Sequence, residues 1–179
     1  MRDAFVAALS LNIFNKYTKR LKMANIAQVV NVLQAMILTD GSKMVLTPTY
    51  YVFDMYKVHQ GALNIPLEIQ CDSMEIGKHK VPSISASASK DSKGLIHITL
   101  ANINPDKGQN ISIDLSAVKI SKVSGTILTA KSLNSYNTFE NKNLVVPKTF
   151  GNIKITPTGL YLNVPAQSII SIEVKSDRP

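Results

Sequence analysis

The stretch from Arg20 to Leu33 constrains the fold of this chain more than any other. Valine and isoleucine lie on both sides of its few polar residues, a composition typical of a strand that is buried on both faces. We therefore predict a strand over 22–32. Ile26, Val29 and Leu33 also satisfy helical spacing, so a helix remains an alternative for this stretch.

An amphipathic helix is predicted on each side of this strand. Over residues 3–19, apolar side chains recur at spacings of three and four. The second helix begins at Thr47-Pro48, an N-cap residue followed by proline in the first turn, and ends before Gly61. Helix, buried strand and helix form one α/β repeat. A parallel strand needs parallel neighbours, so we interpret residues 1–62 as the remnant of a larger α/β domain.

After Pro66 the apolar period changes from helical spacing to two. Apolar residues alternate with polar ones, and turn clusters such as the one over 90–94 separate the segments. The predicted strands cover 84–88, 96–100, 111–115, 119–128, 159–164 and 170–174. Short alternating strands with regular turns predict a jelly-roll β-sandwich over 63–179. The fold class is thus mainly β, with a helix-strand-helix segment in front.

The net charge of +8 raises the question of nucleic-acid binding. The lysines are scattered, and Arg2, Arg20 and Arg178 are the only arginines, so the clustered cations that bind phosphates are absent from the pattern. Neither a nucleic-acid partner nor a membrane partner is therefore expected. Cys71 is alone, which excludes a disulfide within the chain. The start of the chain does not resemble a secretory signal, and the compartment stays open.

No catalytic carboxylate pair is predicted from the acidic residues. Asp91 and Asp106 lie in turn clusters, while Asp114 and Glu173 lie on the outward side of predicted strands. A glycosidase needs two carboxylates that face each other across the scissile bond, and no spacing here nominates such a pair. Tyr136, Phe139, Phe150 and Tyr161 fit either a sugar-stacking platform or core packing.

The histidines do not predict a metal site. His59, His79 and His97 are isolated in the sequence, and no HxH or HExxH motif is present. His97 occupies a polar position of a predicted strand, and we expect it to face solvent. The phosphate-binding and dinucleotide-binding glycine motifs are also absent, so no cofactor is expected.

Gln28 is the one candidate binding residue. It places an amide among Ala27, Val29 and Val30, where its donors and its acceptor need partners. In a parallel α/β barrel, active-site residues gather at the ends of the strands. A contact to substrate and a structural hydrogen bond to neighbouring backbone are equally compatible with the residues alone.

Four segments, in this order and over essentially the whole chain, resemble the C-terminal part of family 51 α-L-arabinofuranosidases. They are DAFVAA over 3–8, MANIAQVVNV over 23–32, PTYYVF over 48–53 and NTFEN over 137–141. The resemblance implies a (β/α)₈ barrel followed by a jelly-roll domain, of which residues 1–62 hold the last part of the barrel. It also implies a retaining hydrolase that removes terminal arabinofuranose from arabinan and arabinoxylan.

The resemblance further implies that both catalytic glutamates lie upstream, so no catalytic residue is expected in this chain. Gln28 matches a substrate-contacting glutamine of the family, which favours a sugar contact. Glu140 matches no catalytic carboxylate. We thus expect an inactive portion of an enzyme that acts on arabinose-containing polysaccharide or oligosaccharide, and that assembles as a homo-oligomer. A structural or oligomerisation domain is the first alternative, and a carbohydrate-binding module is the second.

Overall fold

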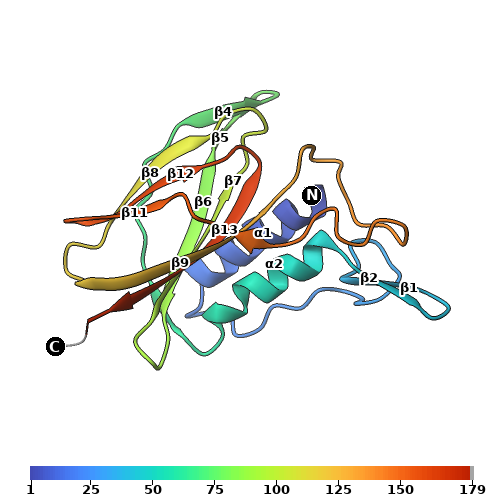
Figure 1. The fold of residues 1–179 in the computed structure, drawn as a ribbon, viewed down its shortest axis with the longest axis horizontal. Helices are drawn as coiled ribbons and strands as arrows, with labels where there is room; N and C mark the ends of the chain where they lie inside the picture. The colour runs from blue at the N-terminus through green and yellow to red at the C-terminus, as the bar shows by residue number, and fades with distance from the viewer. Residues whose placement is uncertain (178–179) are drawn as a thin grey trace.

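Antiparallel strands are the main secondary structure of the computed structural model, which describes residues 1–177 (Figure 1). Two helices, α1 and α2, accompany them. The elements in order are α1 (Arg2–Lys16), β1 (Ile37–Asp40), β2 (Lys43–Leu46), α2 (Pro48–Tyr56), the 3₁₀ turn η1 (Lys57–His59), β3 (Leu63–Ile65), β4 (Ser73–Ile76), β5 (His79–Pro82), β6 (Ile84–Lys90), β7 (Ile96–Asn102), β8 (Gln109–Asp114), β9 (Ile120–Thr129), β10 (Lys148–Thr149), β11 (Ile153–Thr156), β12 (Gly159–Val164) and β13 (Ser168–Ser176).

The strands form one large sheet, one small sheet and two hairpins. The large sheet has six strands in the order β10-β9-β13-β7-β6-β3, and the small sheet has three in the order β11-β12-β8. The hairpins are β1-β2 and β4-β5, and β1-β2 projects from one end of the molecule (Figure 1). Every strand pair is antiparallel. The predicted mainly-β class and the six predicted strands are therefore confirmed.

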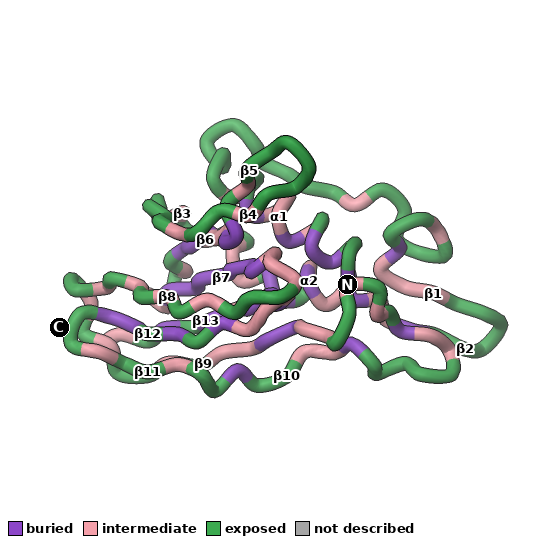
Figure 2. Tube along the Cα trace, turned by 90° about the horizontal axis from the view of Figure 1, so that it is seen from above, coloured by how far each residue is buried: buried purple, intermediate pink, exposed green. Residues whose placement is uncertain are grey.

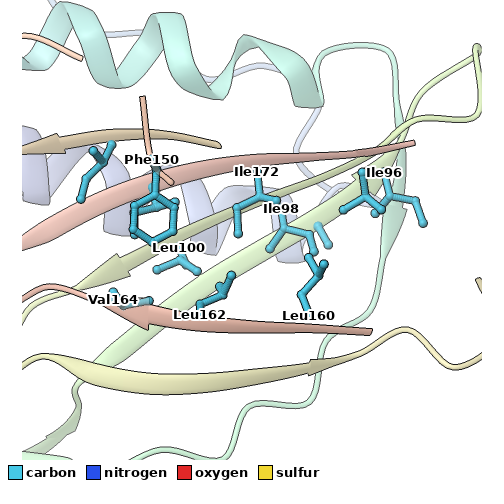
Figure 3. Close-up of a cluster of buried hydrophobic side chains, with 12 residues drawn as sticks. Ile96, Ile98, Leu100, Phe150, Leu160, Leu162, Val164 and Ile172 are labelled. Atoms are coloured by element: carbon cyan, nitrogen blue, oxygen red, sulfur yellow. The ribbon is translucent and has the colours of Figure 1, made fainter. Parts of the chain in front are cut away.

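The main apolar core lies between the two sheets. Ile98 and Leu100 of β7 and Ile172 of β13 pack with Leu160 and Leu162 of β12 in one buried cluster (Figure 3). These residues come from alternate positions of their strands, as the period of two requires. In Figure 2, buried residues run along β7 and β12, whereas the β4-β5 hairpin is mostly exposed.

The two helices cover the opposite face of the six-stranded sheet. Phe5 and Ala8 of α1 and Val52 of α2 pack with Ala101 of β7 and Ile169 of β13. The predicted helices are confirmed, although α1 ends at Lys16, three residues before the predicted end. The Tyr50 N–H donates to the Thr47 side chain at 3.4 Å, which caps α2 as expected. No helix within residues 1–177 is long and apolar enough to cross a membrane.

The predicted strand over 22–32 is wrong for this structure. Residues 21–36 form an irregular connection between α1 and β1, and their one ladder contact is an isolated parallel bridge between Val30 and Ile37. The physical reason is the lack of neighbours, because a lone strand leaves its backbone N–H and C=O groups unpaired. A consequence is exposed apolar surface: Met23 is 75% exposed and Leu33 is 92% exposed.

Candidate functional site

Gln28 lies in the exposed connection between α1 and β1. Its backbone is left-handed, with φ of 57°, as are those of Asn31 and Gln34. Such a conformation is uncommon outside glycine and is worth attention at a candidate site. Asn31 holds the connection in place, because its side chain donates to Thr39 Oγ1 at 2.8 Å and accepts from the Thr39 N–H at 2.7 Å. Among residues 1–177, no hydrogen bond or ion pair joins the Gln28 side chain to another candidate residue.

The acidic residues in turns and at strand ends serve local structure. Asp91 Oδ1 accepts from the N–H groups of Lys93 and Leu95, each at 2.9 Å, and Asp114 accepts from the Ser116 N–H at 2.8 Å. Hydrogen bonds from Ser116 lower the pKa of the Asp114 carboxyl, and hydrogen bonds from the backbone of Glu140 itself and from the Thr138 side chain lower the pKa of Glu140. A general acid needs the opposite shift. These carboxylates are therefore suited to turns rather than to acid catalysis.

The expectation that His97 faces solvent is wrong. Its side chain is only 6% exposed, and its Nε2 lies 3.1 Å from Asp91 Oδ2. Burial raises the pKa of Asp91, but hydrogen bonds from His97, Leu95 and Lys93 outweigh that effect and lower it overall. The physical reason is topological: His97 does alternate with the apolar core residues, but its face of the sheet is covered by the helices instead of by water.

His59 belongs to a buried polar network that the sequence did not indicate. Its Nδ1 lies 2.7 Å from Ser89 Oγ and its Nε2 lies 2.9 Å from Thr99 Oγ1. Burial, followed by the charge of His97, lowers the pKa of His59 to about 4, so the ring is neutral at physiological pH.

Asn12 of α1 extends this network across the helix-sheet interface. Its Nδ2 donates to Ser85 Oγ at 3.1 Å, and its Oδ1 accepts from Ser87 Oγ at 3.0 Å and from Thr99 Oγ1 at 3.2 Å. The buried hydroxyl of Tyr56 has no hydrogen-bond partner among the described residues, and its burial raises its pKa. The nearby side chains of Thr99 and Asn12 partly oppose this rise in pKa. Neither of them forms a hydrogen bond of acceptable geometry with the Tyr56 hydroxyl. The only sequence signal for this network is the Ser-Ala alternation of 85–89.

A polar cleft of about 250 Å³ lies between α2 and the adjoining strands β9 and β13. We call it the α2 cleft. Its lining includes Asp54, Val58, His97, Ser124, Ser171 and Glu173. The structure thereby places His97 and Glu173 together, with 3.9 Å between His97 Nδ1 and Glu173 Oε2. Residues 1–177 contain no group of three or more His, Cys, Asp or Glu side chains that is arranged to hold a metal ion.

The aromatic residues do not form one platform. Phe150 is buried in the core between the sheets, whereas Tyr136 and Tyr161 are more exposed and come from separate parts of the chain. Arg178, one of the three arginines considered for phosphate binding, lies outside the described residues. The fold thus defines an antiparallel β-domain of two facing sheets, with two helices packed on the larger sheet.

Comparison with known proteins gives the family of this β-domain. The sequence profile of the α-L-arabinofuranosidase C-terminal domain matches residues 1–168. The chain is 52% identical over 176 residues to an intracellular exo-α-L-arabinofuranosidase of Bacteroides ovatus, covering 98% of this chain and 34% of that protein. The chain therefore belongs to the α-L-arabinofuranosidase C-terminal domain family.

Solved structures agree with this assignment. The GH51 arabinofuranosidase of Xanthomonas axonopodis pv. citri superposes with a TM-score of 0.93 at 40% identity, over 96% of this chain and 35% of that chain. A family 51 α-L-arabinofuranosidase of Bifidobacterium longum has the same fold, with a TM-score of 0.82 at 22% identity over 98% of this chain and 35% of that one. The chain spans about a third of the length of these relatives.

Proposed function

We propose that this chain is the C-terminal portion of a retaining α-L-arabinofuranosidase that removes terminal arabinofuranosyl residues from arabinan or arabinoxylan, and that it is inactive by itself. The observation that carries the proposal is the 52% identity, over nearly the whole chain, to an exo-α-L-arabinofuranosidase. The lowered pKa values of Asp91, Asp114 and Glu140 support the proposed inactivity, because a general acid needs a raised pKa.

Residues 1–62 are proposed to complete a catalytic barrel, and the two facing sheets of 63–179 to form the enzyme's jelly roll. The exposed apolar side chains of 21–36 support this assignment, because monomeric proteins rarely leave such a group uncovered. With parallel strands beside it, this segment has partners for its backbone and becomes the last barrel strand. In that arrangement the side-chain amide of Gln28 forms a hydrogen bond with a sugar hydroxyl.

Complementation tests the proposal. The chain is purified and assayed on an aryl α-L-arabinofuranoside, alone and after co-expression with the remaining N-terminal part of the Bacteroides ovatus relative. We expect no turnover by the chain alone and clear turnover by the reconstituted pair. Turnover by the chain alone that disappears when one of its own carboxylates is replaced would overturn the claim of inactivity. A stable complex without turnover would overturn the assignment to this enzyme.

The role of Gln28 is tested in the same reconstituted enzyme. Gln28→Ala removes a hydrogen bond to a substrate hydroxyl, and we expect kcat/KM to fall by about tenfold or more. Gln34→Ala is the matched control, since Gln34 is also exposed and also has a left-handed backbone. Equal effects of the two substitutions would argue against a substrate contact at Gln28.

A structural or oligomerisation role is the second candidate. The outward side of α1 favours it, because Val6, Ile13 and the C-cap residue Tyr17 are each at least half exposed. We expect the reconstituted enzyme to form a homo-oligomer, and light scattering measures this directly. Replacement of Ile13 by Glu is expected to shift the mass toward a single copy. A monomeric reconstituted enzyme would remove this role, and millimolar affinity of the chain for arabinan would instead favour a carbohydrate-binding module.

A further inference from the structure

The connection between β9 and β10, residues 130–147, lies where both helices begin. We call it the β9-β10 loop. The N–H of Arg2, the first residue of α1, donates to the Leu133 carbonyl at 3.1 Å. The Asn137 side chain donates to the carbonyl of Leu46 at 2.9 Å, and Leu46 directly precedes the N-cap of α2. The loop therefore joins the N-terminal ends of α1 and α2, beside the β1-β2 hairpin (Figure 1).

This end of the helices is the substrate side of the proposed barrel. In a (β/α)₈ barrel each helix begins on the face where the preceding strand ends, and the active site lies on that face. Both helices begin beside the β9-β10 loop, and residues 21–36 run from the end of α1 to the β1-β2 hairpin (Figure 1). As the last barrel strand, residues 21–36 therefore end on the same face as the loop.

Hydrogen bonds also link the surroundings of Gln28 to the β9-β10 loop. The Val29 carbonyl accepts from the Met36 N–H at 3.0 Å, and the Met36 carbonyl accepts from the Thr47 N–H at 3.0 Å. The residue before Thr47 accepts from Asn137 of the loop. The candidate sugar contact at Gln28 and the β9-β10 loop thus belong to one hydrogen-bonded framework.

Tyr136 has an exposed ring next to a fixed residue of this loop. Asn137 is only 2% exposed, and its side chain donates to the Val145 carbonyl at 2.9 Å and accepts from the Val145 N–H at 2.7 Å. Tyr136 itself is 64% exposed. A tyrosine ring has a broad apolar face and a polar edge, and it loses little conformational entropy on binding. A sugar ring has the same combination of apolar face and polar edge, so the two are suited to stacking.

We propose that Tyr136 is a specificity-determining residue, and that its ring stacks on the sugar unit to which the terminal arabinofuranose is attached. The assignment rests on the proposed function, which supplies both the barrel and the substrate. Tyr136 contacts the part of the polysaccharide or oligosaccharide that is left after hydrolysis. Its contribution is therefore to the binding of chains of sugars, and it is absent for a substrate that has no second ring.

Two substrates of the reconstituted enzyme test this inference. With an arabino-oligosaccharide, we expect Tyr136→Ala to lower kcat/KM about fivefold to tenfold, mainly by raising KM, because stacking is equal in the bound substrate and the transition state. With methyl α-L-arabinofuranoside, which has no second ring, kcat/KM should stay within about twofold of the wild type. Tyr136→Phe keeps the ring and should retain the activity of the wild type on both substrates.

Tyr161→Ala is the matched control, because Tyr161 is a partly exposed tyrosine of β12, in the small sheet. It should leave both substrates unaffected. Circular dichroism checks that the variants fold, and Tyr136→Gln is the second variant if Tyr136→Ala does not. A single chain that joins the N-terminal part of the Bacteroides ovatus relative to residues 1–179 replaces the co-expressed pair if the two parts do not associate.

The inference is overturned if Tyr136→Ala leaves the oligosaccharide kinetics unchanged, if it lowers kcat/KM equally for both substrates, or if Tyr161→Ala has the same effect. Any of these results, with turnover of methyl α-L-arabinofuranoside by the wild type, refutes the role of Tyr136 and leaves the proposed function standing. Absence of turnover of either substrate by the wild-type enzyme would overturn the proposed function, and the role of Tyr136 with it.

Discussion

The two faces of the six-stranded sheet are built on different principles. The face toward β8, β11 and β12 is mainly apolar, with Leu100 and Ile172 in its centre packed against Leu162 of β12. The face toward the helices is mixed: beside Ala101 and Ile169 it buries serines, Thr99 and His97, and His59 of η1 forms hydrogen bonds with two of its hydroxyls. Hydrophobic burial is not directional, whereas hydrogen bonds require specific partners at specific distances. The first face therefore supplies stability, and the second fixes where the helices lie.

This difference predicts unequal costs for substitutions on the two faces, and the largest cost falls on the apolar one. Leu162 is fully buried between the sheets, so Leu162→Ala leaves a cavity, and we expect it to lower the free energy of unfolding by about 3 kcal/mol. Urea denaturation followed by circular dichroism measures the change. Leu63→Ala is the control, since Leu63 is 77% exposed and its truncation is expected to cost little. Equal costs would contradict the assignment of the core.

Acid should selectively weaken the mixed face. The pKa of His59 in the folded chain is about 4, below its usual value, because its ring is buried and lies near His97. Between these two values the unfolded chain binds more protons, so stability falls as the pH falls from about 6.5 toward 4, by at most about 3 kcal/mol.

The measurement is the free energy of unfolding of the wild type and of His59→Gln across this pH range. We expect the variant to lose the part of the pH dependence that comes from His59. His79→Gln should keep the wild-type profile, because His79 is exposed on β5. An unchanged profile in His59→Gln would show that this ring does not titrate as its surroundings require.

The same contrast explains what could be predicted from the sequence. Alternation identified the strands of the apolar face, because Ile96, Ile98 and Leu100 must share one side. It could not show that helices cover the other side, and His97 was therefore placed in solvent. The predicted strand over 22–32 failed for a related reason: its composition fits burial, but burial needs partners that residues 1–177 do not place there. The α2 cleft joins Asp54, His97 and Glu173 from three distant elements, and no local spacing indicates such a meeting.

A smaller effect is expected from the hydrogen bonds that position α1. Asn12→Ala leaves Ser85, Ser87 and Thr99 without one partner each, and we expect a loss of about 2 kcal/mol. In the background of Thr99→Val, Asn12→Ala should cost less, because the Thr99 hydroxyl, one of the three groups that lose a partner, is already absent. A double-mutant cycle in urea measures the coupling. Strict additivity would show that the network does not act as a unit.

The smallest effect on stability is expected at Leu33, which belongs to neither face. Leu33 is 92% exposed, so Leu33→Ser should change the free energy of unfolding of the chain by less than about 0.5 kcal/mol. If residues 21–36 become a buried strand in the reconstituted enzyme, the same substitution then places a hydroxyl in an apolar environment and lowers the yield of active complex. Unfolding and turnover are measured on one preparation. A large loss of stability in the chain alone would mean that residues 21–36 are already packed there. Their apolar side chains would then need no further partner to be buried.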